Sequence, residues 1–358
     1  MVNNSKRSWI SRFRRDSQDW YDETVEDISQ RGTILRMIII TILVYLFVAM
    51  LVGIYWSQEP DRFDVKVQTD LSIKATQQAP VRGTTTTYTL IHVAKTLLDK
   101  PGGYLTNDVA PPGVWLDNIP NWEYGVLIQV RDMSKAMRES ISRSQTQSTE
   151  DVDLKLAEPR LNFESESWML PSSENQYREG IDKLEAYALR LSDTGPKGSQ
   201  FYTRADNLSF WLSSVEARMG SLSQRLSASV GQARLNTDLA GDNAAKQATQ
   251  APIEMQIKTP WMEIDDVFYE ARGTTWALIH LLHAVEIDFA EVLEKKNARV
   301  SLQQIIRELE ATQEAVYSPM ILNGSGFGVL ANHSLVMASY ISRANAALIN
   351  LRELLARG

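Results

Sequence analysis

Residues 37–56 read MIIITILVYLFVAMLVGIYW, a run of twenty residues without a charged side chain. As an α-helix this run spans roughly 30 Å, at about 1.5 Å per residue, which matches the hydrocarbon core of a bilayer. Tyr55 and Trp56 close the run, and such aromatic rings favour the membrane interface. The run is longer than the apolar part of a signal peptide, and no small-residue cleavage site follows it. We therefore predict an uncleaved transmembrane signal anchor that contacts the lipid bilayer through residues 37–56.

The segment before this run, residues 1–36, is a basic tail. Its seven basic residues are Lys6, Arg7, Arg12, Arg14, Arg15, Arg31 and Arg36. Short basic segments stay in the cytoplasm, whereas long domains cross the membrane largely regardless of their charge. Arg62, Lys66 and Lys74 follow the run closely and weaken the asymmetry. We predict a cytoplasmic N-terminus in the bacterial inner membrane, with the bulk of the chain in the periplasm.

The composition of the chain restricts its function. It has 358 residues, of which 44% are hydrophobic and 23% are charged, as in ordinary folded proteins. The net charge is −7, which argues against nucleic-acid binding, because that requires a basic surface. The chain contains no cysteine, which excludes disulfides, thiolate metal sites and a cysteine nucleophile.

The remaining chain has the apolar spacing of helices and few alternating segments, so we predict an all-α bundle. The predicted helices cover about 84–99, 121–145, 173–191, 200–239, 261–296, 301–316 and 332–356. We interpret residues 57–80 as a stalk, 81–239 as the first part of the bundle, 240–260 as a flexible linker and 261–358 as the second part. The bundle is either continuous or split into two at the linker, and it is compatible with a homo-oligomer.

Two stretches with a common opening contain three of the four histidines. They are RGTTTTYTLIHVAKTLL (82–98) and RGTTWALIHLLHAVEIDF (272–289). The histidine after RGTT is offset by two residues between the copies, which turns it by about 200° on a helix. The shared motif therefore does not imply equivalent chemistry on equivalent helix faces. Duplication of a helical hairpin is the alternative.

His280, His283 and Glu286 lie at three-residue steps on one face of the predicted helix. Imidazole and carboxylate groups are suitable zinc ligands. However, the motif lacks the glutamate that gives the H-E-x-x-H pattern its general base. The alternative is a core helix whose polar stripe meets solvent or a buried hydrogen-bond partner, and we predict no cofactor.

The segment 101–125 is an unusually long and aromatic loop for a helical protein. Its aromatic side chains include Tyr104, Trp115, Trp122 and Tyr124. Long ordered loops are often functional, and interfaces are enriched in tryptophan and tyrosine. These four residues are candidate anchors for an envelope protein or a sugar. Alternatively, the loop folds back and caps the bundle.

Three long motifs indicate a family. KPGGYLTNDVAPPGVWLDNIPNWEYG (100–125), SRSQTQS (142–148) and FYTRADNL (201–208) resemble an uncharacterised family of proteobacterial single-pass inner-membrane proteins, catalogued as a domain of unknown function. The resemblance implies a Gram-negative host but no activity. Our leading hypothesis is a non-enzymatic, membrane-anchored periplasmic scaffold that binds an envelope partner. The alternative is a metal- or glycan-binding protein or hydrolase that uses the His280/His283 helix or the 101–125 loop.

Overall fold

The structure is a computed structural model that describes residues 33–144, 149–193, 195, 198–235, 254–318 and 320–357. The chain divides into two compact units, Met1–Tyr55 and Trp56–Gly358. Among the described residues, one helix, Thr33–Trp56, is long and apolar enough to cross a membrane, and its side chains are mostly exposed. The predicted basic tail lies outside the described residues, except for its last four positions.

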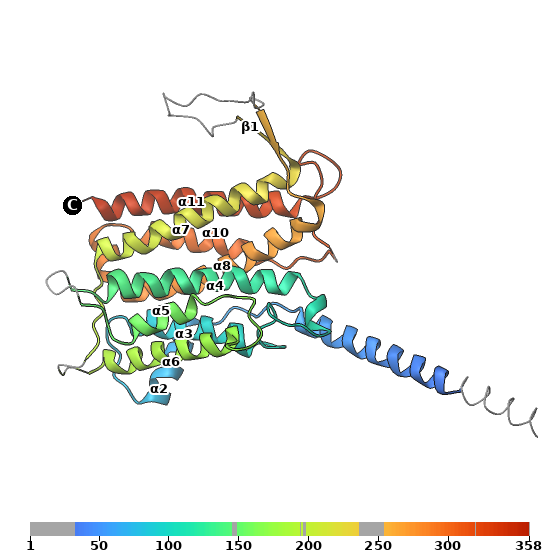
Figure 1. Cartoon of the computed structure of the whole chain (residues 1–358). Coiled ribbons are helices and arrows are strands. Elements are labelled where there is room, and N and C mark those ends of the chain that lie inside the picture. Colours follow the sequence, from blue (N-terminus) through green and yellow to red (C-terminus); the bar gives the residue numbers. More distant parts are fainter. Residues whose placement is uncertain are drawn as a thin grey trace, which may run out of the picture. The chain divides into compact units, whose positions relative to one another are not determined.

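The second unit is a helical bundle, which confirms the predicted helical fold (Figure 1). Its longer helices are α2 (Val65–Thr76), α3 (Thr84–Asp99), α4 (Asn118–Ala136), α5 (Leu154–Leu161), α6 (Ser173–Leu191), α7 (Ala205–Ser227), α8 (Ile264–Asp288), α9 (Ala290–Lys295), α10 (Arg299–Ala311) and α11 (His333–Ala356). The short helical turns are η1 (Gly113–Trp115), the π-helical η2 (Met137–Ile141), η3 (Ala228–Val230) and η4 (Trp261–Glu263). Strands β1 (Gln232–Leu235) and β2 (Glu254–Ile257) pair antiparallel, with Gln232 opposite Ile257.

The α4–α8 pair lies at the centre of the bundle. On one side α7, α10 and α11 pack together, and on the other side α3, α5 and α6 do so. Trp122, Trp211 and Trp276 are fully buried in this core. Helices from both predicted parts thus pack against each other in one unit, so the bundle is continuous rather than split near residues 240–260. Residues 240–253 of the predicted linker lie outside the described residues.

Helices α4 and α8 touch through their backbones at two glycines. A Cβ atom at Gly125 would lie 2.2 Å from the carbonyl oxygen of Glu270, and one at Gly273 would lie 2.0 Å from that of Trp122. Gly273 is therefore required inside α8, where the second RGTT lies. Gly83 of the first RGTT instead precedes α3 with a φ of 87°, a conformation that favours glycine. The two copies of RGTT have different structural roles.

Residues 57–80, predicted as a stalk, are part of the bundle. Trp56 packs on the core, close to Gly102. The following residues 57–64, which we call the strap, run along α8 and lead into α2. Arg272 of α8 binds the carboxylate of Glu59 with its Nε 2.7 and 2.8 Å from the two oxygens. The stalk prediction is therefore wrong, because charged and aromatic strap residues have partners on helices more than 200 positions away.

Candidate functional site

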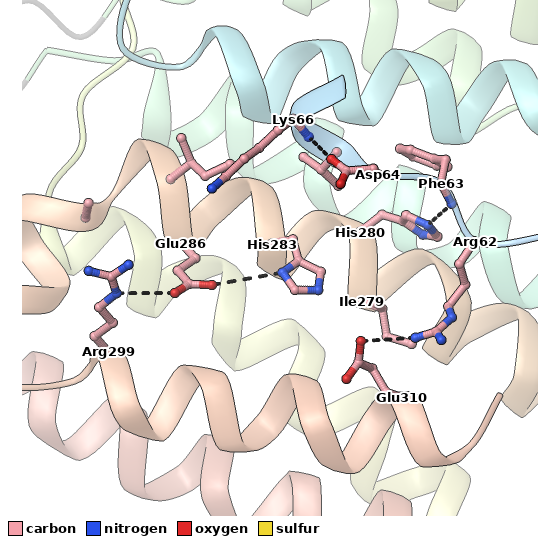
Figure 2. A pocket seen from close by; sticks show the side chains of 13 residues that line it. Arg62, Phe63, Asp64, Lys66, Ile279, His280, His283, Glu286, Arg299 and Glu310 are labelled. Atoms are coloured by element: carbon pink, nitrogen blue, oxygen red, sulfur yellow. Dashed lines mark hydrogen bonds and ion pairs between the residues drawn. The ribbon is translucent and has the colours of Figure 1, made fainter. Parts of the chain in front are cut away.

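The histidine-rich part of α8 borders a groove of about 760 Å³ between the strap, the start of α2, and α10 (Figure 2). Its charged lining residues are Arg62, Asp64, Lys66, Glu286, Arg299 and Glu310. Arg62 pairs with Glu310 at 3.1 Å and Arg299 pairs with Glu286 at 3.2 Å, so one ion pair joins the strap to α10 and the other joins α10 to α8. The groove is mixed in charge, and most of its charged groups already bind one another.

His280 is a structural residue at the edge of this groove. Its Nδ1 donates to the carbonyl oxygen of Trp276 at 2.7 Å, and its Nε2 accepts from the backbone N–H of Phe63 at 3.1 Å. The imidazole also stacks on the Phe63 ring, with a centroid distance of 3.9 Å and an angle of 12° between the rings. Burial lowers the pKa of His280 to about 3, so the ring is neutral. Both ring nitrogens are therefore occupied.

The predicted zinc ligands do not assemble. His283 is partly exposed, and its Nδ1 lies 4.0 Å from an Oε of Glu286. The other carboxylate oxygen of Glu286 accepts from Arg299 and, at 2.6 Å, from Gln303. Within the described part of the chain, no group of three histidine, aspartate or glutamate residues is arranged to hold a metal ion. The prediction that His280, His283 and Glu286 form one metal site does not fit this geometry.

Two of the four predicted partner-binding aromatics are core residues. Trp122 is fully buried and packs against Trp276, with ring centroids 5.2 Å apart. Tyr104 is also buried, packs edge-on against Tyr177, and donates its hydroxyl to the carbonyl oxygen of Ser165 at 3.1 Å. Neither side chain is available to a partner. The predicted loop is too long, because α4 begins at Asn118 and Trp122 lies on the buried face of this helix, whereas the segment with Tyr104 folds back on the bundle. The alternative interpretation, a loop that folds back on the bundle, fits Tyr104.

The loop is closed by an ion pair that the sequence did not indicate. Lys100 and Glu123 are both buried, and the lysine Nζ lies 2.5 Å from a carboxylate oxygen of Glu123. Glu123 also accepts from the backbone N–H groups of Leu105 and Thr106, each at 2.9 Å. This carboxylate, which lay among the aromatic residues of a possible sugar-binding loop, therefore organises the loop from inside. In the sequence, Lys100 opens the KPGG turn and Glu123 follows much later, and no spacing rule pairs the two residues.

The other two predicted aromatics, Trp115 and Tyr124, are exposed by 54% and 41%. Tyr124 borders a groove of about 490 Å³ between α4, α7 and α8. Gln129 also lines this groove, is fully buried, and has no hydrogen-bond partner for either amide atom among the described residues. Beside it, Arg225 of α7 pairs with Glu270 of α8. Sequence spacing did not single out Gln129, because its missing partners are a property of the packed helices.

Comparisons with other proteins identify a family but no activity. No curated protein and no solved structure matches the chain. The family described as an uncharacterized protein conserved in bacteria matches residues 28–358, which include the apolar helix, the strap and the complete bundle. This match confirms the resemblance expected from the three sequence motifs. The chain belongs to the uncharacterized bacterial family DUF2333.

Proposed function

We propose that the protein is a single-pass inner-membrane protein whose bundle lies in the periplasm and binds an envelope protein without catalysing a reaction. The apolar helix Thr33–Trp56 supports the anchor, because its side chains are exposed in the protein and need a non-aqueous surrounding. The basic residues of the tail support the orientation. The family match supports a bacterial source.

The observation that carries the proposal is the strap. Glu59 binds Arg272, Arg62 pairs with Glu310, and the backbone of Phe63 donates to His280. Arg272 also donates to the carbonyl oxygens of Thr312 and Glu314, at 3.1 and 2.8 Å. A loosely tethered domain would not require so many contacts directly after its anchor. These contacts support a bundle that is held close to the membrane and works there.

The groove beside Tyr124 is the proposed surface for the protein partner. A buried amide without hydrogen bonds costs about 1–3 kcal/mol, so the unpaired groups of Gln129 destabilise the free protein. The side chain is buried in the free protein, so a bound polypeptide segment would remove this cost after Gln129 turns into the groove to meet its backbone donors and acceptors. The exposed ring of Tyr124 adds the aromatic contact that is common at interfaces.

The partner surface is tested by a photo-crosslinking amino acid in place of Tyr124 in living cells. A matched control is the same amino acid in place of Ile349 of α11, which is equally exposed, at 40%. We expect a specific adduct at Tyr124, its loss in the Gln129→Leu background, and none at Ile349. Gln129→Leu should not weaken the fold, because it removes an unpaired amide. An adduct that is unchanged by Gln129→Leu contradicts the proposed recognition.

The topology is tested separately, and the absence of cysteine makes the test simple. We expect Val152→Cys to react with a membrane-impermeant maleimide once the outer membrane is permeabilised. Ser5→Cys should react only after the inner membrane is lysed. The reverse pattern would place the bundle in the cytoplasm, and release of the protein by alkaline carbonate would exclude the anchor.

A second candidate function is binding of a small ligand in the groove of Figure 2. The observation that favours it is Lys66, whose side chain extends toward α8 and forms no ion pair within the described residues. Binding of inorganic phosphate to the purified full chain, lost on Lys66→Ala, would support a ligand-binding function of this groove. Phosphate binding that is unchanged in Lys66→Ala would exclude Lys66 as its ligand.

A further inference from the structure

The end of the bundle that carries Trp56, which we call the tether end, contains four connections between helices. Figure 1 shows the α3–α4, α5–α6, α7–α8 and α10–α11 connections at this end. Hydrogen bonds join these connections in two pairs. Tyr104 and Asn107 donate to the carbonyl oxygens of Ser165 and Ser167, and Asn323 donates to that of Ser229. The α3–α4 connection is thus bonded to α5–α6, and α7–α8 is bonded to α10–α11, at the same end of the bundle.

Each of these connections exposes aromatic and aliphatic side chains. In α3–α4, Val114 is exposed by 52% and Trp115 by 54%. In α5–α6, Trp168 is exposed by 54% and Leu170 by 92%.

The apolar side chains of the other two connections are also exposed, most of them to a larger fraction. In α7–α8, Trp261 is exposed by 76% and Met262 by 79%. In α10–α11, Phe327 and Val329 are fully exposed. The tether end thus presents an apolar side chain from every connection, and such surfaces mark sites of interaction.

The opposite end of the bundle is different. Its connections are α2–α3, α4–α5, α6–α7 and the short segment from α8 to α10. Among their described residues, the large apolar side chains that are exposed are Val81 and Val152. Trp115, Trp168 and Trp261 are the exposed tryptophans of the described chain, and all three lie at the tether end. The aromatic residues are therefore concentrated on one end.

We propose that the tether end contacts the interfacial region of the lipid bilayer, into which Trp115, Trp168, Trp261 and Phe327 insert. This inference rests on the proposed membrane anchor. Trp56 is the last residue of the apolar helix and packs on the bundle, so chain continuity places the tether end at the membrane surface. Tryptophan rings are enriched at this depth of the bilayer, where they combine apolar contact with a polar N–H group.

The charges at the tether end define the kind of contact. Asp117, Glu164, Glu166 and Glu263 are exposed there, together with the basic Lys258. Acidic groups do not attract anionic lipids, so the contact depends on apolar and aromatic side chains. The contact should therefore not become stronger when the fraction of anionic lipid increases.

The experiment uses the full chain in vesicles of phosphatidylethanolamine and phosphatidylglycerol, with a single cysteine that carries an environment-sensitive fluorophore. The tether-end variants are Trp115→Cys and Phe327→Cys. The controls at the opposite end are Val152→Cys and Val300→Cys, which replace side chains exposed by 66% and 74%. Val48→Cys, within the apolar helix, reports on the anchor itself. Quenching is measured with lipids that carry a nitroxide in the headgroup or on the acyl chain.

We expect quenching of Trp115→Cys and Phe327→Cys by the headgroup nitroxide, and none at Val152→Cys or Val300→Cys. If Val48→Cys is quenched by the acyl-chain nitroxide while the tether-end sites remain unquenched, the inference fails and the anchor stands. If Val48→Cys is not quenched, the proposed anchor fails. If the tether-end sites are shielded from aqueous iodide in native membranes but unquenched in vesicles, a protein covers them, and the inference is also overturned.

Discussion

His280 needs a neutral ring to satisfy both of its hydrogen bonds, since Nδ1 must donate and Nε2 must accept. Burial is the main cause of its lowered pKa, and electrostatic interactions with His283, His92 and Arg62 lower it further. The backbone hydrogen bond to Trp276 acts in the opposite direction. The pKa in the folded protein is about 3, whereas an unfolded histidine has a pKa near 6.5.

His280 should therefore make the protein less stable as the pH is lowered. Between the two pKa values the unfolded chain binds a proton that the folded chain does not bind. The free energy of unfolding therefore rises with pH in this range, and the contribution of His280 reaches its full value above about pH 6.5. We expect a loss of about 2 kcal/mol between pH 7 and pH 5 from this residue. Unfolding of wild type and His280→Gln at both pH values measures it, because the buried carboxylates are common to both. An equal pH dependence in the two proteins would contradict the prediction.

Arg272 should contribute more to stability than any exposed arginine. Arg272→Met leaves the carboxylate of Glu59 and two carbonyl oxygens without their donor, at a cost of about 3–5 kcal/mol. The control is Arg82→Met, whose ion pair with Glu291 is about two-thirds exposed, so we expect at most about 1 kcal/mol. Chemical unfolding of the full chain in detergent compares the two. Similar losses would show that the strap pair is not a buried clamp.

The sequence could indicate which residues share a helix face but not what covers that face. Three-residue spacing placed His280 and His283 together correctly. The residue that covers His280 and donates a backbone hydrogen bond to it is Phe63. Phe63 lies 217 positions earlier, in a segment without helical periodicity. Likewise, Trp122 and Trp115 are alike in the sequence, and only the fold separates a core residue from an exposed one.

Among the elements, helix ends were predicted well where glycine, proline or polar residues interrupt the apolar pattern. The expected 84–99 and 173–191 agree with α3 and α6, and 332–356 agrees with α11 within one residue. The expected 200–239 is too long, because Gly231 has a φ of 85° and the strand β1 follows it. Four residues of strand give too short a pattern for prediction from the sequence.

The close contact between α4 and α8 should depend on Gly273. Gly273→Ala places a methyl group against the backbone of Trp122, which cannot move without separating two core helices. We expect a loss of about 1–3 kcal/mol or more in the free energy of unfolding. Gly220→Ala in α7 is the control, because its Cβ would meet only Asn345 Nδ2 at 3.4 Å. That change should be neutral or stabilise the protein by up to about 1 kcal/mol. Equal losses would mean that helix propensity, and not the contact, determines the effect.

At the scale of the whole molecule, the strap and the tether end should both favour contact between the bundle and the membrane. The strap fixes the first residues after the apolar helix to α8 and α10. The exposed apolar side chains then lie where the chain leaves the proposed membrane anchor. A surface held so close to the bilayer needs little affinity of its own, because a short connection gives a high effective concentration.

Lengthening this connection should therefore separate the bundle from the membrane. A Gly-Ser linker of about 20 residues inserted between Tyr55 and Trp56 has a root-mean-square length of roughly 25 Å. It leaves the strap and the bundle unchanged but lowers the effective concentration of the tether end at the bilayer. We expect headgroup quenching at Phe327→Cys to decrease, while acyl-chain quenching at Val48→Cys stays the same. The same linker added after Gly358 should change neither signal. If quenching at Phe327→Cys persists with the inserted linker, the apolar connections bind lipid without help from the strap, and the strap does not determine how the bundle meets the membrane.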